Sequence, residues 1–170
     1  ANLASLRDLP AVTKDGVPIE LMINAGLRED VAALDLTGAR GIGLFRTEFQ
    51  FLVSATLPRR ERQQSLYRGV LEAAGDKPVV FRTVDIGGDK SVPYLASEIA
   101  ARDENPAMGW RALRLALERE GLLKVQARAL MEAAAGRTLN VMFPMVSEPW
   151  EYEAARNLFV GQRAWLAQHN

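Results

Sequence analysis

The alternation of apolar and polar residues divides this chain into short apolar runs and longer segments of helical periodicity. Four of the runs are β-prone and are bounded by glycine, proline or charged residues, which is typical of buried strands. The strands predicted in this way are residues 19–24, 41–47, 79–85 and 139–146. The last run is apolar almost throughout, which favours a parallel strand covered on both faces.

Helical spacing follows each run. Residues 28–36 predict a short helix, and after a loop at 49–57 a second helix is predicted over 58–74, with Pro58 in its first turn. The residues that share one face of this second helix are Leu66, Tyr67, Val70, Leu71 and Ala74. Further along, Asn105-Pro106 is predicted to start a pair of helices that ends near Gly136, and Ser147 to cap a last helix that ends near Gln168.

The predicted order is therefore strand then helix, four times, which indicates the α/β class. Residues 1–18 show little periodicity and contain the turn signal Lys14-Asp15-Gly16, so we interpret them as a lead-in segment before a domain at 19–170. Four such units form either a small open sheet or half of an eight-unit barrel, and the pattern alone does not choose between them.

Composition excludes several classes of protein. Lysine plus arginine and aspartate plus glutamate both number 21, so no broad basic surface for nucleic acid is expected. The absence of cysteine excludes disulfides, thiolate chemistry and cysteine-based zinc sites. No apolar run approaches the roughly 18 residues of a membrane span, so we expect a soluble, most simply cytoplasmic, protein with no membrane partner.

Two of the predicted strands end in the same dipeptide, Arg-Thr, followed by an acid: Arg46-Thr47-Glu48 and Arg82-Thr83-Val84-Asp85. Since parallel strands end at the same edge of a sheet, Arg46 and Arg82 are predicted to lie side by side. Paired guanidiniums suit a phosphate, because each planar fork donates two parallel hydrogen bonds. The competing interpretation is that each arginine belongs to a surface ion pair.

Other candidates are weaker on spacing alone. The turn Ile86-Gly87-Gly88-Asp89-Lys90 is either a flexible connection or a source of free amides and an ammonium for an anion. Arg111 lies beside the apolar stripe of the predicted third helix, where it either reaches the strand ends or faces solvent, and its spacing favours the solvated face. The single histidine, His169, falls at the end of the last helix, and we expect no catalytic role for it.

Four stretches, taken together and in order, resemble motifs of enzyme I of the bacterial phosphotransferase system, the phosphoenolpyruvate-protein phosphotransferases. They are Gly-Ile-Gly-Leu-Phe-Arg-Thr-Glu-Phe, Phe-Arg-Thr-Val-Asp-Ile-Gly-Gly-Asp-Lys, Glu-Asn-Pro-Ala-Met-Gly-Trp-Arg-Ala-Leu-Arg and Val-Met-Phe-Pro-Met-Val. The lead-in sequence Ala-Val-Thr-Lys-Asp-Gly is similar to the nitrogen-related branch of that family.

The resemblance implies the first four units of a TIM-like barrel that binds phosphoenolpyruvate and Mg²⁺ and passes the phosphoryl group to a histidine on a separate domain, which then serves a phosphocarrier protein. It implies that Arg46 and Arg82 bind the substrate phosphate, and that Arg46, Arg82 and Arg111 form part of the catalytic site. The family's metal ligands and proton-donating cysteine lie on later strands, so no metal ligand is assigned to this chain. The alternative is a non-catalytic anion-binding or assembly fragment. Because half a barrel exposes two strand edges, a homodimer is also expected.

Overall fold

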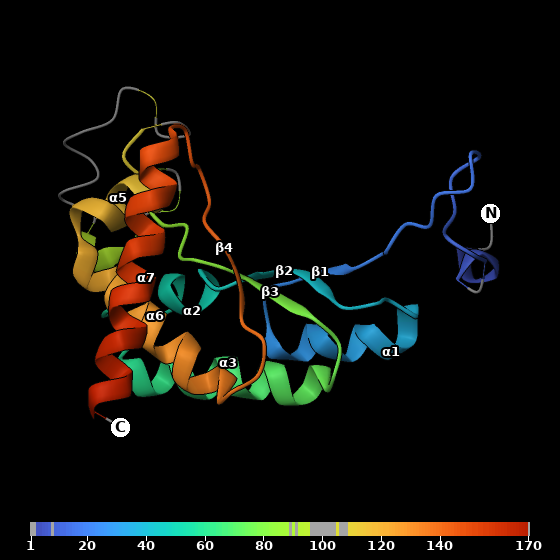
Figure 1. Cartoon of the computed structure of the whole chain (residues 1–170), viewed down its shortest axis with the longest axis horizontal. Coiled ribbons are helices and arrows are strands. Elements are labelled where there is room, and N and C mark those ends of the chain that lie inside the picture. The colour runs from blue at the N-terminus through green and yellow to red at the C-terminus, as the bar shows by residue number, and fades with distance from the viewer. Residues whose placement is uncertain are drawn as a thin grey trace.

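A computed structural model of the chain describes residues 3–7, 9–88, 90, 92–95, 105 and 109–169. Strands and helices alternate along them (Figure 1). The strands are β1 (Ile23–Ala25), β2 (Ile42–Arg46), β3 (Val79–Arg82) and β4 (Asn140–Met142). The α-helices are α1 (Ala33–Thr37), α2 (Phe49–Leu52), α3 (Arg60–Ala74), α5 (Ala112–Glu118), α6 (Glu120–Ala134) and α7 (Pro149–His169), and the 3-10 helices are η1 (Leu3–Leu6), η2 (Arg28–Ala32) and η3 (Pro93–Leu95).

The four strands form one parallel sheet in the order β1-β2-β3-β4. Helices connect each strand to the next, and α7 follows β4. A doubly wound open sheet reverses its strand order, whereas the strands of a TIM barrel follow one another in sequence. The α/β prediction is confirmed, and the arrangement is that of four βα units, half of a TIM-like barrel.

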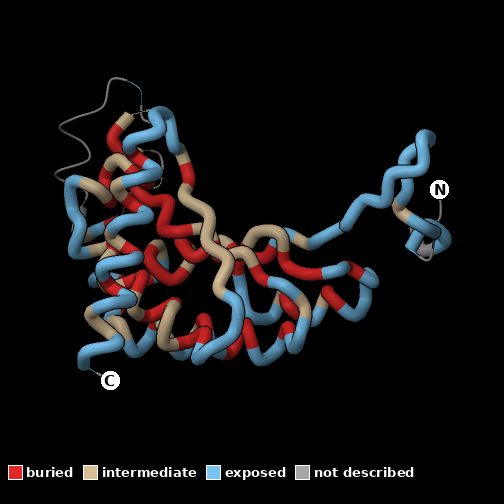
Figure 2. The backbone as a smooth tube through the Cα atoms, in the orientation of Figure 1, coloured by how far each residue is buried: buried red, intermediate tan, exposed pale blue. Residues whose placement is uncertain are grey.

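The main core lies between the sheet and the helices. Phe45 of β2 and Phe81 of β3 are fully buried and meet edge to face with 5.6 Å between ring centroids, and Tyr67 of α3 packs on Phe81 in the same way at 5.4 Å. Buried positions gather where the sheet meets the helices (Figure 2). The residues that alternate with these aromatics, Arg46 and Arg82 among them, are only half-buried, so the other face of the sheet is the more open one.

The first strand is shorter than predicted. Residues 19–24 were expected to form it, but β1 begins at Ile23. The amide of Ile19 instead donates to the carbonyl of Ala11, and Val12 bridges Pro18 in an antiparallel pair around the predicted turn. The start of the predicted strand therefore belongs to a small hairpin formed with the lead-in segment. This hairpin projects away from the helices in Figure 1.

Three further boundaries were wrong. The third strand, predicted over 79–85, ends at Arg82. Residues 49–57 were predicted as a loop, but α2 forms at their start because Phe51 is buried and Gln50 hydrogen-bonds to Tyr67. The helix predicted from Pro58 begins at Arg60. The helix start predicted at Asn105-Pro106 involves Pro106, which lies outside the described residues, and α5 begins at Ala112.

The fourth strand was predicted to be long and covered on both faces, and both expectations were wrong. β4 has only three residues, and all are half-buried. It pairs with β3 on one side, and Met145 just beyond it adopts a left-handed backbone conformation that ends the extended run. An apolar sequence alone therefore does not ensure that packed elements cover both faces of the strand.

Within the described ranges, every helix is too short or too polar to cross a membrane.

Candidate functional site

Arg46 and Arg82 are the last residues of β2 and β3 and are paired across the parallel ladder. Adjacent strands lie roughly 4.8 Å apart, and paired residues point to the same face of a sheet. The predicted side-by-side placement of the two arginines is confirmed. They project from the more open face, opposite to the buried Phe45 and Phe81.

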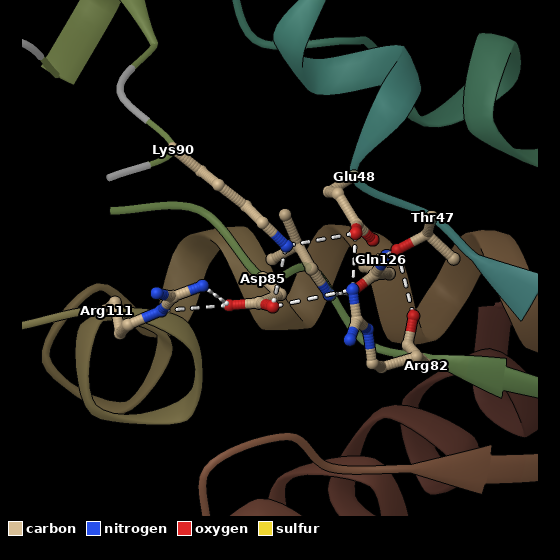
Figure 3. Close-up of polar contacts among 8 residues, drawn as sticks. Thr47, Glu48, Arg82, Asp85, Lys90, Arg111 and Gln126 are labelled. Carbon is tan, nitrogen blue, oxygen red and sulfur yellow. Dashed lines mark hydrogen bonds and ion pairs between the residues drawn. The ribbon is translucent and has the colours of Figure 1, made fainter. Parts of the chain in front are cut away.

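Five charged side chains meet beyond these strand ends and form what we call the charged cluster: Glu48, Arg82, Asp85, Lys90 and Arg111 (Figure 3). Arg82 donates to Glu48 and lies 3.4 Å from Asp85. The ammonium of Lys90 bridges the same two carboxylates, at 3.3 Å from Glu48 and 3.0 Å from Asp85. Glu48 therefore pairs with cations from the next strand and the following turn.

Arg111 completes the cluster from the far end of the connection after β3. Its Nε and Nη2 both donate to Asp85, at 3.2 and 2.9 Å. The solvated position that its spacing favoured is wrong, since Arg111 is buried. Gly87 explains its placement: Arg111 bridges Gly87, and a Cβ on Gly87 would lie 2.7 Å from the Trp110 carbonyl oxygen. Only glycine allows this approach.

Of the two interpretations of the glycine turn, the one with free amides is not supported at Gly87 and Lys90. The amide of Gly87 donates to the Lys90 carbonyl and the amide of Lys90 to the Gly87 carbonyl, so these two amides are occupied within the turn. Asp89 lies outside the described residues. Of the predicted anion-facing groups in this turn, the Lys90 ammonium is the one that the structure brings to the cluster.

Asp85 remains ionised within this cluster. Burial raises the pKa of its carboxyl group, but the hydrogen bonds and charges of Arg111 and Lys90 lower it by more, so that the pKa lies below its ordinary value. Together with the neighbouring Arg46, four cations accompany the two carboxylates of Glu48 and Asp85. The region has an excess of positive charge that suits an anion.

The guanidiniums of the two strand-end arginines keep unused donors. The Nε atoms of Arg46 and Arg82 are both buried, and neither has a hydrogen-bond partner in the described part of the chain. Arg46 stacks over the Phe49 ring at 4.9 Å, and its charge adds to the backbone hydrogen bonds from Gly26 and Leu27 that lower the pKa of Asp30. A buried donor left unpaired costs about 1–3 kcal/mol. These donors are therefore the natural place for an anionic ligand.

A Mg²⁺ site does not fit the residues that the structure describes. No group of three or more histidine, aspartate or glutamate side chains suited to a metal occurs within the described ranges. Glu48 and Asp85 each already face two or more cations, which disfavours a divalent cation between them. His169 lies at the end of α7, stacked on Trp165 at 4.2 Å.

Sequence reasoning missed Gln126. This fully buried side chain of α6 bonds to Thr47, Tyr67 and the Val84 amide directly behind the arginines. A signal was available: Gln126 is a polar residue on the same helix face as Leu123 and Leu130, which are also buried.

Known proteins resemble the chain along nearly its whole length. It is 41% identical over 168 residues to a phosphoenolpyruvate-protein phosphotransferase of Lactococcus lactis, covering 98% of this chain and 29% of that protein. Proteins of the same name from Haemophilus influenzae and Staphylococcus carnosus are 45% and 43% identical over 146 and 165 residues, or 86% and 97% of this chain. The chain spans 25% and 28% of the length of those two relatives.

The family model described as PEP-utilising enzyme, PEP-binding domain, matches residues 1–169. That model covers both strand-end arginines and the whole charged cluster. The chain thus belongs to the family of PEP-utilising enzymes, in the region that the family model describes as the PEP-binding domain.

Proposed function

We propose that this chain is the phosphate-binding half of the active site of a phosphoenolpyruvate-dependent phosphotransferase that moves the phosphoryl group to a protein histidine. The observation that carries the proposal is the pair of buried, unpartnered Nε donors of Arg46 and Arg82 on in-register strands. The transferred phosphoryl group spreads negative charge over its equatorial oxygens, and donors fixed in advance stabilise that charge.

Each arginine has a distinct part in this proposal. Arg46, whose buried Nε has no hydrogen-bond partner within the described residues, offers that donor to the phosphate. Arg82 offers its Nε while Glu48 and Asp85 hold its other end. Arg111, fixed by two bonds to Asp85, adds positive charge at the rim. Catalytic roles for Arg46, Arg82 and Arg111 are part of the proposal.

The remaining functions follow from the resemblance to enzyme I. The resemblance implies that Mg²⁺ would be held by residues of later strands, and the acids in the described part of the chain form no group of three suited to it. The phosphoryl group would pass to a histidine on another domain and then to a phosphocarrier protein, in the cytoplasm. A non-catalytic anion-binding or assembly fragment is the alternative, which the next experiment tests.

Calorimetry with phosphoenolpyruvate separates the two functions. The chain by itself should bind phosphoenolpyruvate with millimolar or weaker affinity in the presence of Mg²⁺, about −4 kcal/mol, and should release no pyruvate. The arginines account for the phosphate, but the metal ligands and the partners of the substrate's carboxylate are elsewhere. The intact protein should bind more tightly and release pyruvate. The chain carrying both Arg46→Ala and Arg82→Ala is the control and should show no heat of binding.

Two results would overturn this assignment. Micromolar binding or pyruvate release by the chain alone would mean that the site is complete without further strands. An intact protein that binds phosphate but does not consume phosphoenolpyruvate would favour the non-catalytic alternative.

We also propose that the chain by itself forms a homodimer. β1 and β4 each pair with one neighbour within the described sheet, and apolar residues beside them, Leu21 and Val146, are exposed. Such edges associate readily. The lead-in hairpin covering one edge is the lesser alternative, and in Figure 1 it projects away from the body. Sedimentation equilibrium at micromolar concentration should give a dimer or larger species, and a cooperative monomer would refute the proposal.

A further inference from the structure

A buried polar network lies directly behind the strand-end arginines, and Gln126 of α6 is at its centre. The amide group of Gln126 donates to the Thr47 hydroxyl at 3.0 Å and to the Tyr67 hydroxyl at 3.0 Å, while its oxygen accepts the Val84 amide at 2.9 Å. Both hydrogens and the oxygen are therefore used, and the side chain is fully buried. Figure 3 shows Gln126 beside Thr47 at the ends of the two strands.

The groups that Gln126 holds belong to the two segments that carry the arginines. Thr47 immediately follows Arg46, and its hydroxyl donates to the Arg82 carbonyl at 2.9 Å. Val84 lies between Arg82 and Asp85. One side chain on a helix thus joins the end of β2 to the end of β3, one or two residues beyond the guanidiniums.

The sheet alone does not provide this alignment. The pairing of β2 with β3 contains a register irregularity between Ile42 and Phe45, just before the arginines. Just beyond the last ladder pair, the hydrogen bonds of Thr47 and Gln126 connect the end of β2 to the end of β3. The separation of the guanidiniums therefore depends on side-chain bonds as well as on the backbone ladder.

Gln126 is itself held in one orientation. The Tyr67 hydroxyl accepts from Gln126 and, at 2.7 Å, from Gln50, and it donates to Gln63 at 3.2 Å. Burial raises the pKa of Tyr67 above its ordinary value, so the hydroxyl stays protonated, and the Gln63 oxygen that accepts its hydrogen sets the direction of donation. This leaves the Gln126 amide one arrangement that satisfies all of its partners.

We infer that Gln126 is a positioning residue for the proposed phosphoryl transfer: acting through Thr47 and Val84, it sets the spacing at which Arg46 and Arg82 meet a phosphate. The inference rests on the proposed function. A displacement of about 1 Å at a reacting centre, caused from outside it, lowers the rate by roughly 10²-fold.

The test is Gln126→Met in the intact protein, which keeps the length of the side chain and removes its three hydrogen bonds. We expect kcat/KM for phosphoenolpyruvate to fall by about 10–100-fold, and inhibition by inorganic phosphate to weaken in parallel, because both depend on the arginine pair. Gln162→Met is the matched control. Gln162 is also buried and bonds at 2.6 Å to Arg128 of α6, but it lies on α7 away from the strand ends. Its kinetics should equal wild type.

A double-mutant cycle shows whether Gln126 acts through Thr47. Thr47→Val removes the hydroxyl between Gln126 and the Arg82 carbonyl while keeping the shape of the side chain. If the inference holds, the losses in the double variant are clearly less than additive, since both changes break the Gln126–Thr47 bond although each also removes bonds of its own. Fully additive losses would overturn it. Should Gln126→Met fail to fold, Thr47→Val alone decides: a fall in kcat/KM with weaker phosphate inhibition supports the inference, and wild-type values refute it.

The outcomes separate this inference from the proposed function. A wild-type protein that does not consume phosphoenolpyruvate contradicts the proposed function, whatever the variants do. A wild-type protein that does so, with a folded Gln126→Met variant of equal kcat/KM and equal phosphate inhibition, contradicts the inference alone. Equal losses in Gln126→Met and Gln162→Met also contradict it, because they would reduce the effect to a general loss of packing.

Discussion

Replacing Arg46 or Arg82 by alanine in the intact protein should lower phosphoenolpyruvate turnover by about 10²–10³-fold, the scale for removing one electrostatic contact fixed in advance. Both residues end adjacent strands in register, and both keep a buried, unused Nε donor. Lysine should restore little activity at either position, because an ammonium cannot reproduce the two parallel bonds of the guanidinium fork.

The two variants should differ in stability. Arg82→Ala removes a partner of both Glu48 and Asp85, whereas Arg46→Ala removes a stacking contact with the Phe49 ring and an electrostatic attraction to Asp30. Arg82→Ala should therefore unfold at lower denaturant concentration. Arg60→Ala is the control for turnover, since Arg60 lies on α3 and pairs with Glu61 and Glu132. Near-wild-type turnover of both Arg46→Ala and Arg82→Ala in steady-state kinetics would contradict the assignment of these arginines to the phosphate.

The pairing of Arg46 with Arg82 was predictable because it depends on a local pattern. Each strand ends in Arg-Thr, and the parallel α/β order brings such ends to one edge. The carboxylates that pair with the cations of this site could not be predicted from the sequence. An ion pair within Arg46-Thr47-Glu48 was the simple alternative, but Glu48 bonds instead to Arg82 and Lys90. Sequence spacing does not reveal which cation reaches a carboxylate across a sheet.

Arg111 shows where periodicity fails. Its spacing along a predicted helix favoured solvent, yet the residue lies in extended backbone just before α5 and reaches Asp85 because it bridges Gly87. That contact joins the two ends of the long connection between β3 and α5, so no local pattern contains it. The family resemblance placed Arg111 near the site where spacing did not.

The strand boundaries were wrong for a related reason. Apolar content predicted long first and fourth strands, but Ile19 pairs with Ala11 in the lead-in hairpin and Met145 leaves the extended conformation. Hydrogen-bond partners decide where a strand begins and ends, and those partners lie elsewhere in the chain. The order and the parallel sense of the strands were predictable, because they follow from the alternation with helices.

Asp85→Asn should destabilise the folded chain by about 3–5 kcal/mol, the scale for removing one partner from a buried charge network. Asp85 accepts bonds from Arg111 and Lys90 and lies 3.4 Å from Arg82. Without its charge, three buried or half-buried cations would face the single carboxylate of Glu48. Urea unfolding near pH 7 measures the loss. Asp35→Asn is the matched control, because the side chain of Asp35 is 93% exposed and pairs with Lys77 at 3.4 Å; it should cost less than about 1 kcal/mol.

The pH dependence of this difference tests its electrostatic origin. The pKa of Asp85 in the folded chain is lower than its ordinary value of about 4, so its contribution to stability is fully present above that value and is lost as the pH falls through the lower, folded pKa. The gap in unfolding free energy between wild type and Asp85→Asn should therefore be widest near neutrality and narrow as the pH falls below about 4. A gap that stays constant across this range would show that Asp85 stabilises the chain by shape and hydrogen bonding alone, since a carboxyl group whose charge is unimportant contributes equally in both protonation states.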